Sequence, residues 1–420
     1  MADPKLVAAS YDRVAQAATA GAIDDSAPYR AYNNFVKREL ITAALDVVAC
    51  GARGHRSTGA GEGIMVRVLD IASGRGGDMA KWMQCRPTSS SSEAKRLVVA
   101  AVDGYDISSE SVKEANRRAA ECARRPVAGG RQPPRFEYRV ADCFADSFWN
   151  DVEQQALSRL DLATHHAASF DGPPADAPLP PGRFDIVSIQ FALHYGCVDV
   201  ASLDRFLAGV SRSLVPGGCF IGTIVDAVEL SRQLREEADY AAISSHTGEG
   251  LPPPSASSST LFRLCPLDPF PIAPAVVDRD GSTTAAASSV GVPTGSSAVL
   301  PMGFHYRIRL DASAAPKDAA APSTESLVDC DEYVLPSDTL IRRAALVGLL
   351  PCASSTVGGP MRNFAMYAPE WVRHSATVAL RRGGRSASQL SPDEQRLVNL
   401  YCSFCFVKGV CPPSADVSHS

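Results

Sequence analysis

Short apolar runs alternate along this chain with segments of helical periodicity, and this alternation constrains the fold more than any other feature. Five runs have the length and composition of strands, namely VRVLDI (66–71), LVVAAVDGYDI (97–107), FEYRV (136–140), FDIVSIQF (184–191) and CFIGTIV (219–225). Helical spacing is found over residues 29–48, 79–82, 108–115 and 203–214. Strands that alternate with helices indicate an α/β fold with a mostly parallel sheet covered on both faces.

The C-terminal part of the chain adds three strand candidates and one helix. The strands are FHYRIRL (304–310), LVDCDEYVL (327–335) and LVNLYCSFCFV (397–407), and the helix is expected over residues 338–349. Ligands of open α/β sheets bind beyond the carboxyl ends of the parallel strands. The element order therefore predicts where a site lies before any motif is considered.

Ser-, Pro-, Gly- and Ala-rich stretches interrupt this pattern. We expect them to be loops or disordered inserts near 51–63, 87–95, 161–182, 241–302 and 311–325. A length of 420 residues alone suggests up to about three domains. Because inserts lengthen a chain without adding core, we expect an N-terminal extension over residues 1–27 and a single domain over 28–420.

Composition excludes some classes of protein. A net charge of −5 and a hydrophobic content of 45% argue against a wholly disordered chain and against a polybasic, sequence-blind nucleic-acid binder. A more selective nucleic-acid contact stays open. The longest apolar runs, 97–102 and 220–225, fall well short of the ~20 residues of a membrane helix, so no membrane span is expected. Residues 1–10 lack the order of a secretory signal, which favours a reducing compartment and free thiols.

A single CxxC, formed by Cys402 and Cys405, lies in a predicted strand. Residues three apart in a strand point to opposite faces, and no second CxxC accompanies the pair. We therefore predict no metal site there or elsewhere.

The sharpest local signal is VLDIASGRGGDMAKW (68–82), a strand that leads through Gly74, Gly76 and Gly77 into a helix. Glycines there allow a tight turn and a close approach of the backbone to a ligand, although an ordinary strand-to-helix turn also uses glycine. No Gly-Lys-Ser/Thr follows, so this is not a phosphate-binding Walker loop. Ala72 stands at the first glycine position of the dinucleotide GxGxxG pattern, so this is a departure from that pattern as well.

Polar side chains follow the second, third and fourth predicted strands. Asp103 or Asp106 could accept hydrogen bonds from a ribose diol, and Asp142 could accept one from an adenine amino group. Helix capping explains each of these acids equally well when it is taken alone. At the end of the fourth strand, SIQFALHYG (188–196) brings a Gln, a His and two aromatic residues to one edge, which favours a functional site.

In combination these segments resemble the mRNA cap guanine-N7 methyltransferases, which are class I, S-adenosylmethionine-dependent enzymes. The resemblance is carried by YRAYNNFVKRELI (29–41), LDIASGRGGDMAKW (69–82), YDISSESVKEANRR (105–118), FDIVSIQFALHY (184–195), PGGCFIGTIVD (216–226), CDEYVLP (330–336) and NLYCSFCF (399–406). It covers most of the chain outside the inserts. It implies a class I methyltransferase fold, Rossmann-like, with a mostly parallel seven-stranded sheet and helices on both faces.

The resemblance also implies roles for individual residues. S-adenosylmethionine, which becomes S-adenosylhomocysteine, would be held by Lys37, Asp70, Ala72, Gly74, Asp106, Asp142, Gln190 and Tyr195. The GpppN cap would be held by Asn33, Asn34, Arg75, Lys81, Arg118, His194, Tyr306, Glu332 and Tyr401. No residue would act as an acid or base, because guanine N7 carries a lone pair and no proton, so the catalytic contribution would be positioning alone.

Two positions depart from the family pattern. The family usually has Gly-Cys where this chain has Ala72-Ser73, and commonly Lys where it has Arg75. The Ala72 Cβ would narrow the pocket if the backbone φ there is positive. Arg75 keeps the positive charge and changes its shape.

The partners implied are the capped mRNA 5′ end and, more remotely, other capping enzymes or RNA polymerase II, for a monomer acting in the nucleus. Two rival functions stay open at this point. One is a class I methyltransferase with a small-molecule or protein substrate, which would have no common reason to carry NNFVK together with Glu332 and Tyr401. The other is a catalytically silent, methyltransferase-like scaffold in RNA processing, which the Ala72-Ser73 departure and the long inserts keep open.

Overall fold

The fold is taken from a computed structural model that describes residues 4–19, 27–51, 64–88, 97–124, 133–155, 184–247, 261–270, 299–311, 326–352, 361–382 and 390–409. The low-complexity stretches largely fall outside these ranges, as do His165, His166 and Arg385. Among the described residues, no helix is long and apolar enough to cross a membrane. No set of three His, Cys, Asp or Glu side chains in those same ranges is arranged to hold a metal ion.

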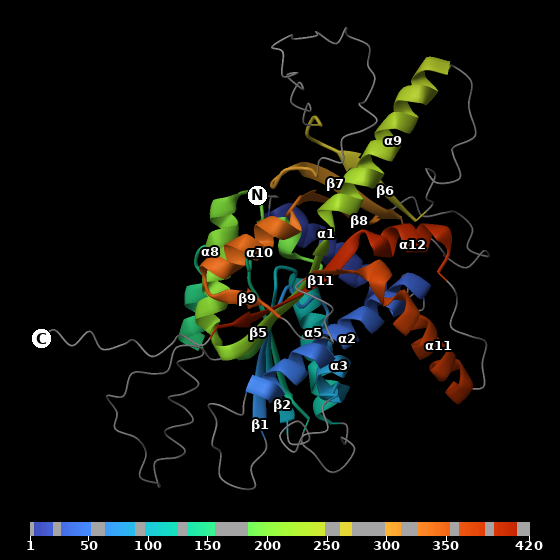
Figure 1. Ribbon diagram of the computed structural model, residues 1–420. Helices are drawn as coiled ribbons and strands as arrows, with labels where there is room; N and C mark the ends of the chain where they lie inside the picture. The colour runs from blue at the N-terminus through green and yellow to red at the C-terminus, as the bar shows by residue number, and fades with distance from the viewer. Residues whose placement is uncertain are drawn as a thin grey trace, which may run out of the picture.

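A mostly parallel sheet forms the centre of the molecule (Figure 1). Its strands are β1 (Ile64–Ile71), β2 (Leu97–Asp106), β3 (Arg135–Val140), β4 (Phe184–Gln190), β5 (Leu214–Val225), β9 (Leu349–Pro351), β10 (Met361–Asn363) and β11 (Tyr401–Lys408). Seven of them run in the order β10-β11-β5-β4-β1-β2-β3, and β9 also pairs with β11. Strands β1 to β5 are parallel, while β9, β10 and β11 pair antiparallel.

Helices connect and cover the strands. They are α1 (Pro4–Thr19), α2 (Pro28–Gly51), α3 (Met79–Gln84), α5 (Ser109–Ala123), α7 (Leu193–Gly196), α8 (Val200–Ser213), α9 (Ala227–Thr247), α10 (Ser337–Leu346), the 3-10 turn η1 (Phe364–Tyr367), α11 (Ala368–Arg382) and α12 (Pro392–Asn399). Ser108 caps α5, because its hydroxyl accepts a hydrogen bond from the Ser111 N–H at 3.0 Å.

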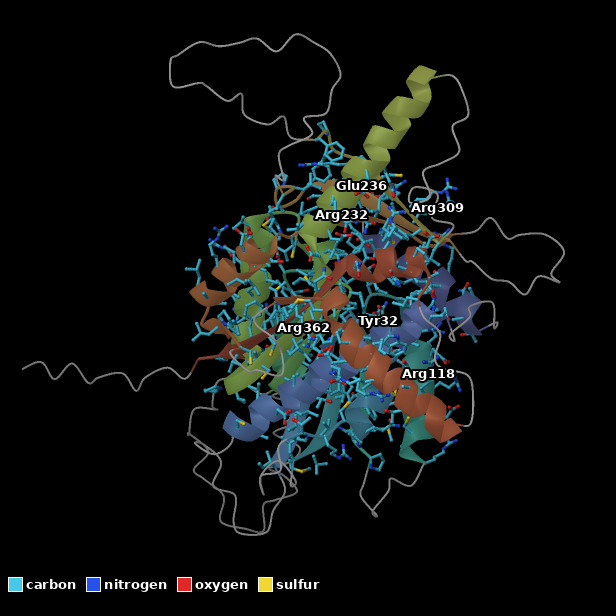
Figure 2. All side chains as sticks on the ribbon, turned by 45° about the vertical axis from the view of Figure 1, so that its right-hand side comes forward. Tyr32, Arg118, Arg232, Glu236, Arg309 and Arg362 are labelled. Carbon is cyan, nitrogen blue, oxygen red and sulfur yellow. The ribbon has the colours of Figure 1, made fainter. Side chains whose placement is uncertain are left out.

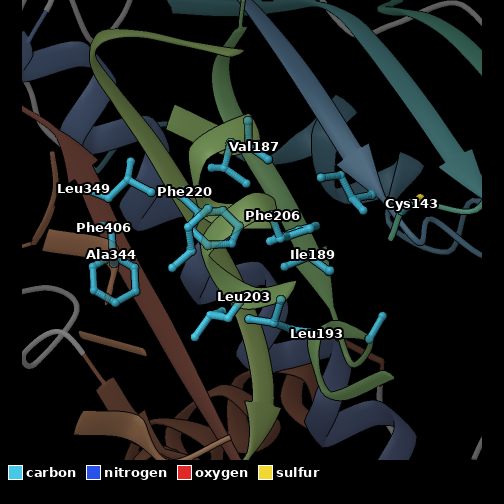
Figure 3. Close-up of a cluster of buried hydrophobic side chains, with 14 of the residues drawn as sticks. Cys143, Val187, Ile189, Leu193, Leu203, Phe206, Phe220, Ala344, Leu349 and Phe406 are labelled. Atoms are coloured by element: carbon cyan, nitrogen blue, oxygen red, sulfur yellow. The ribbon is translucent and has the colours of Figure 1, made fainter. Parts of the chain in front are cut away.

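Both faces of the sheet are buried, and the strand residues alternate between two cores. One core lies under α8 and α10 and contains Phe220 and Phe406 beside Val187, Ile189 and Phe206 (Figure 3). The other lies under α2 and α3. Figure 1 shows these two pairs of helices on opposite sides of the sheet. The alternation confirms the mostly parallel sheet covered on both faces.

The CxxC cysteines follow the same alternation. Cys402 packs in the core under α8 and α10, and Cys405 packs in the core under α2 and α3. Their side chains therefore lie on opposite faces of β11, as strand periodicity predicts.

A second, antiparallel sheet consists of β6 (Phe262–Pro266), β7 (His305–Asp311) and β8 (Ser326–Tyr333). Its inner face, with Phe262, Tyr306 and Ile308, packs in a core shared with the start of α2, α9 and the C-terminal helices. The hydroxyl of Tyr32 on α2 donates to the Phe364 carbonyl at 2.6 Å, which joins α2 to the C-terminal segment near Arg362 (Figure 2).

Several elements differ from the sequence expectations. Strand β6 and the end of α9 lie inside 241–302, which we expected to be loop. The sequence does not reveal β6 because its pairing partner, β7, lies far along the chain. The run 397–407 begins as the end of α12, which a capping box at Ser391 and Glu394 starts, and becomes strand only at Tyr401. Helix α1 lies within 1–27 and packs against α5 and β8.

Prediction for the central sheet. Replacing Gly222 of β5 by Ala would place a Cβ 2.3 Å from the Ile189 carbonyl oxygen and 2.4 Å from the Phe404 ring. We expect a loss of about 3 kcal/mol in unfolding free energy, measured by urea denaturation, because neither neighbour can move without breaking sheet pairing. The control Gly409→Ala, whose Cβ would make only ordinary contacts at 3.6 Å, should change stability by less than about 0.5 kcal/mol. Equal effects of the two changes would contradict this packing.

Candidate functional site

A cavity of about 380 Å³ lies beyond the carboxyl ends of β1, β2 and β4. Its walls come from these strand ends, from Lys37 of α2 and from one stripe of α1 that includes Val7, Tyr11 and Val14. This is the edge at which a parallel sheet binds ligands. Its volume lies within the range of small-molecule sites.

The glycine-rich turn after β1 forms one wall of the cavity. Ala72 has φ 53°, Gly74 φ 54° and Gly76 φ 68°, so three residues of this turn lie in the left-handed region. The Ser73 N–H bonds to the Tyr105 carbonyl at 3.0 Å, which ties the turn to β2. The positive φ holds Ala72 in the left-handed region at a conformational cost, because its Cβ crowds the backbone there.

Asp106, at the end of β2, fixes this turn from the neighbouring strand. Its carboxylate accepts hydrogen bonds from the Gly74 N–H at 2.7 Å and from the Ser108 N–H at 2.9 Å. Burial raises the pKa of Asp106 above its usual range. Asp103, the other acid considered on this strand, forms an ion pair with Arg135 at 3.1 Å and is not part of the cavity wall.

Asp142 lines the cavity beyond β3. One of its oxygens accepts a hydrogen bond from the Phe144 N–H at 3.0 Å. The turn-capping explanation and the ligand-binding one are therefore compatible, since the carboxylate has a second oxygen.

Asp70, Asp78 and Lys81 are buried, and Lys37 beside Asp78 is partly buried. Lys37 Nζ and Lys81 Nζ lie 2.9 Å and 2.6 Å from Asp78 Oδ1. These two cations hold the pKa of Asp78 below its usual value. Asp70 lines the cavity, and burial together with the Asp78 charge raises its pKa to about 7. Asp78 stands at the N-cap of α3 but its side chain makes no capping bond, because the carboxylate serves the lysines.

The end of β4 is strained and polar. Phe191 has φ 57°, which is costly for an aromatic residue, and its N–H is held by the Thr223 hydroxyl at 2.8 Å. Gln190 donates from Nε2 to the Ser188 hydroxyl at 3.2 Å, whereas its buried Oε1 has no partner among the described residues. An orphaned buried acceptor on a cavity wall indicates a place for a ligand donor.

Next to the cavity, three polar side chains contact the carboxylate of Glu332 on β8. Tyr306 donates to one carboxylate oxygen at 2.6 Å, and Tyr195 donates to the other at 3.2 Å. His194 Nε2 lies 3.4 Å from that second oxygen, and its buried Nδ1 has no partner in the described part of the chain. Tyr195 belongs to the cavity wall, so it joins the cavity to this cluster.

The structure thus sorts the residues that sequence singled out. The cavity lining contains Lys37, Asp70, Ala72, Gly74, Arg75, Asp106, Arg118, Asp142, Gln190 and Tyr195. Outside it lie Asn33, Asn34, Lys81, His194, Tyr306, Glu332 and Tyr401. Tyr401 packs edge-on against Phe191, 4.8 Å between ring centres, so it backs the cavity wall. Lys81 is buried and donates to Asn34 Oδ1 at 2.8 Å, and Arg118 pairs with Glu114 at 2.7 Å.

Sequence reasoning missed the contribution of α1. Pro4, Val7, Tyr11 and Val14 recur at helical spacing and all line the cavity. That spacing is visible in the sequence, but nothing in it says which surface the stripe covers. Asp78 and Phe191 were also missed, because their roles depend on a buried ion cluster and on a backbone angle.

A comparison with protein families gives a match over more than half of the chain. The family model for the mRNA (guanine-N(7))-methyltransferase domain matches residues 2–246. The chain belongs to this family. The match includes α1 and every predicted cofactor residue and ends before Tyr306, Glu332 and Tyr401.

Related proteins are named for the same activity as this family. The chain is 30% identical over 232 residues to an mRNA cap guanine-N(7) methyltransferase of Caenorhabditis elegans, covering 54% of this chain and 47% of that protein. It is 26% identical over 360 residues to mRNA cap guanine-N(7) methyltransferase 1 of Oryza sativa subsp. japonica, covering 83% and 70%. The chain thus spans about half the length of the first relative.

Among solved structures, the chain is similar to an S-adenosylmethionine-dependent methyltransferase from Clostridium acetobutylicum. The TM-score is 0.35 at 10% identity, and the alignment covers 82% of this chain and 84% of the other.

Prediction for the turn. Ala72→Gly should raise the unfolding free energy by about 0.5–1 kcal/mol, because relief of the positive φ outweighs the added freedom of the unfolded chain. Thermal and urea denaturation measure the change. Ala192→Gly, at a buried cavity position with φ −142°, should instead destabilise the protein. A stability loss at position 72 would show that the turn is not strained there.

Prediction for Asp70. The native state holds a proton on Asp70 between about pH 4 and pH 7, where the unfolded chain has lost it. Stability should therefore fall as pH rises through this window, and Asp70→Asn should remove this contribution, on the order of 3 kcal/mol between pH 5 and pH 8. Urea denaturation at pH 5 and pH 8 measures the slope. An unchanged slope in Asp70→Asn would assign the pH dependence to other groups.

Proposed function

We propose that this protein transfers a methyl group from S-adenosylmethionine to guanine N7 of the GpppN cap of mRNA. The observation that carries the proposal is one bond, the 3.2 Å hydrogen bond from Tyr195 to Glu332. The cavity is lined by all eight residues that we expect to bind the cofactor. The hydrogen bond joins this cavity to the buried carboxylate that we expect to bind guanine.

The residues of the cavity fit the cofactor. The orphaned Gln190 Oε1 offers an acceptor on the wall, and Gly74 has no atom within 4 Å of a built Cβ, so the backbone there is open to a ligand. Asp106 would take the ribose hydroxyls and Asp142 the adenine amino group. Lys37 and Asp70 would lie by the methionine end, and Tyr195 would close over it.

When bound, S-adenosylmethionine supplies an electrophilic methyl group. The chain's own task would be orientation, since N7 has a free lone pair and needs no base. None of the roles assigned to the lining residues requires one of them to take a proton. Holding the nucleophile in line with the methyl carbon is enough to remove several kcal/mol of barrier, on the order of 7.

Glu332 would identify guanine. Its carboxylate already binds two hydroxyl protons, so its environment suits a base edge with two donors, as guanine presents at N1 and its amino group. Negative charge there also favours a purine that becomes cationic as the methyl arrives. The buried Nδ1 of His194 has no partner among the described residues, and in the tautomer that carries its proton there it would donate to guanine O6.

The triphosphate would pass along Arg75 and Arg118, which are cavity residues. Lys81 would act from beneath, by holding Asn34 and Asp78, with Asn33 and Tyr401 completing the cap side. Action on capped mRNA would place the protein in the nucleus, as a monomer, in reach of other capping enzymes and RNA polymerase II.

Prediction for cap methylation. Incubation with labelled S-adenosylmethionine and GpppG-capped RNA, followed by nuclease release, should give labelled 7-methylguanosine cap. Glu332→Gln should lower kcat/KM for this RNA by about tenfold to a hundredfold, because a charged acceptor is lost. Its calorimetric affinity for the cofactor should stay within about twofold.

Asp106→Ala is the matched opposite case, because it should abolish cofactor affinity first. A wild-type protein that binds the cofactor and leaves GpppG-RNA unlabelled would overturn the proposed function. Full activity of Glu332→Gln would overturn only the role of that residue.

A further inference from the structure

Tyr11 of α1 is a polar group that the proposed reaction has not yet used. Its hydroxyl lies 2.8 Å from the Tyr195 hydroxyl, and the two rings meet edge to face at 6.1 Å. Burial raises the pKa values of both tyrosines, so both are neutral phenols with one proton each.

The direction of the bond between them follows from counting protons. Tyr195 donates its single proton to Glu332. It has none left for Tyr11, so Tyr11 donates to the Tyr195 oxygen. The resting order of donation runs from Tyr11 to Tyr195 to Glu332, and Tyr306 donates to the other carboxylate oxygen.

This arrangement conflicts with a bound guanine. The oxygen that accepts from Tyr195 also faces His194 Nε2 at 3.4 Å, so both of its lone-pair directions point at a donor already in place. A guanine donor could bind this oxygen only if one of these donors moves away. When Tyr195 gives way, its proton needs another acceptor, because a buried hydroxyl without one is costly. The oxygen of Tyr11 lies within hydrogen-bond distance to accept it, and the Tyr11 proton, displaced in turn, can rotate toward the cavity that Tyr11 lines.

We propose that Tyr11 is a positioning residue that reverses its hydrogen bond with Tyr195 and so frees Glu332 for guanine. The inference rests on the proposed function and deepens it. Tyr11 donates in the free protein and accepts in the complex with the cap. It acts through Tyr195 and touches neither the reacting nitrogen nor the methyl group.

The anchoring of α1 supports this role. The next residue, Asp12, accepts hydrogen bonds from the Ser108 hydroxyl at 2.6 Å and from the Glu110 N–H at 3.1 Å, at the start of α5. These bonds place α1 relative to the end of β2, where Asp106 lies. Tyr11 is therefore held in place by the body of the fold.

The test is Tyr11→Phe, which removes one oxygen atom and keeps the ring contact. In the free protein Tyr195 keeps its acceptor, whereas in the cap complex its proton is stranded. We expect KM for GpppG-capped RNA to rise roughly tenfold, with kcat and the calorimetric Kd for S-adenosylmethionine within about twofold. Thermal unfolding of each variant checks that it is folded.

Tyr367→Phe is a matched control. Its buried hydroxyl also lies 2.8 Å from a hydroxyl oxygen, that of Ser403, away from the cavity. This variant should leave KM unchanged. A similar rise in KM would mean that loss of any buried phenol bond has the effect, and would overturn the inference.

A double-mutant cycle separates positioning from packing. In a Tyr195→Phe background no proton needs an acceptor, so adding Tyr11→Phe should not raise KM further. Additive effects, or a cofactor Kd that rises as much as KM, would mean that Tyr11 only lines the cavity, and would overturn the inference.

Wild-type protein that neither binds nor methylates GpppG-RNA would overturn the proposed function and this inference together. An active wild type with an unchanged Tyr11→Phe would overturn this inference alone.

Discussion

The central strands are buried on both faces. Every residue of β4 is buried, and its neighbours β1 and β5 direct alternate side chains into two separate cores. A strand buried on both sides cannot slip by one residue without exchanging the contents of the two cores. Register fixed in this way brings the ends of β1, β2 and β4 to one edge. The glycine turn, Asp106 and Gln190 face a common cavity for that reason.

Two buried carboxylates near that edge, Asp70 and Glu332, have different surroundings. Lys37 and Lys81 neutralise Asp78, which leaves Asp70 as the buried acid whose proton is easily gained or lost near neutral pH. Glu332, farther out, is surrounded by hydroxyl donors. Asp70 thus lies beside a group of ion pairs, whereas Glu332 accepts hydrogen bonds from two tyrosine hydroxyls. A cationic cofactor and a base with two donor groups would meet these two environments.

Much of this architecture could be predicted from the sequence, because it rests on periodicity. The strands, the Ser108 cap and the opposite faces of Cys402 and Cys405 follow from spacing along the chain. The family resemblance gave a cofactor set whose members all line the cavity, although their roles in binding stay predictions. Strand β6 could not be found, since five residues gain their stability from a partner strand distant in sequence. The role of Tyr11 could not be predicted either, because it depends on where α1 packs. The strain at Phe191 is a backbone angle that only the folded structure fixes.

The pairing of β6 with β7 has an evolutionary consequence. These neighbours are joined through residues 267–304, a stretch whose composition predicts a loop, and both ends of that connection are fixed by the sheet. Lengthening a chain connection between fixed ends costs little, about 0.6 kcal/mol for each doubling. Sequence can therefore accumulate between the two strands while Tyr306 and Glu332 keep their places. A lineage carrying this fold is free to vary in length at this position without moving either of these side chains.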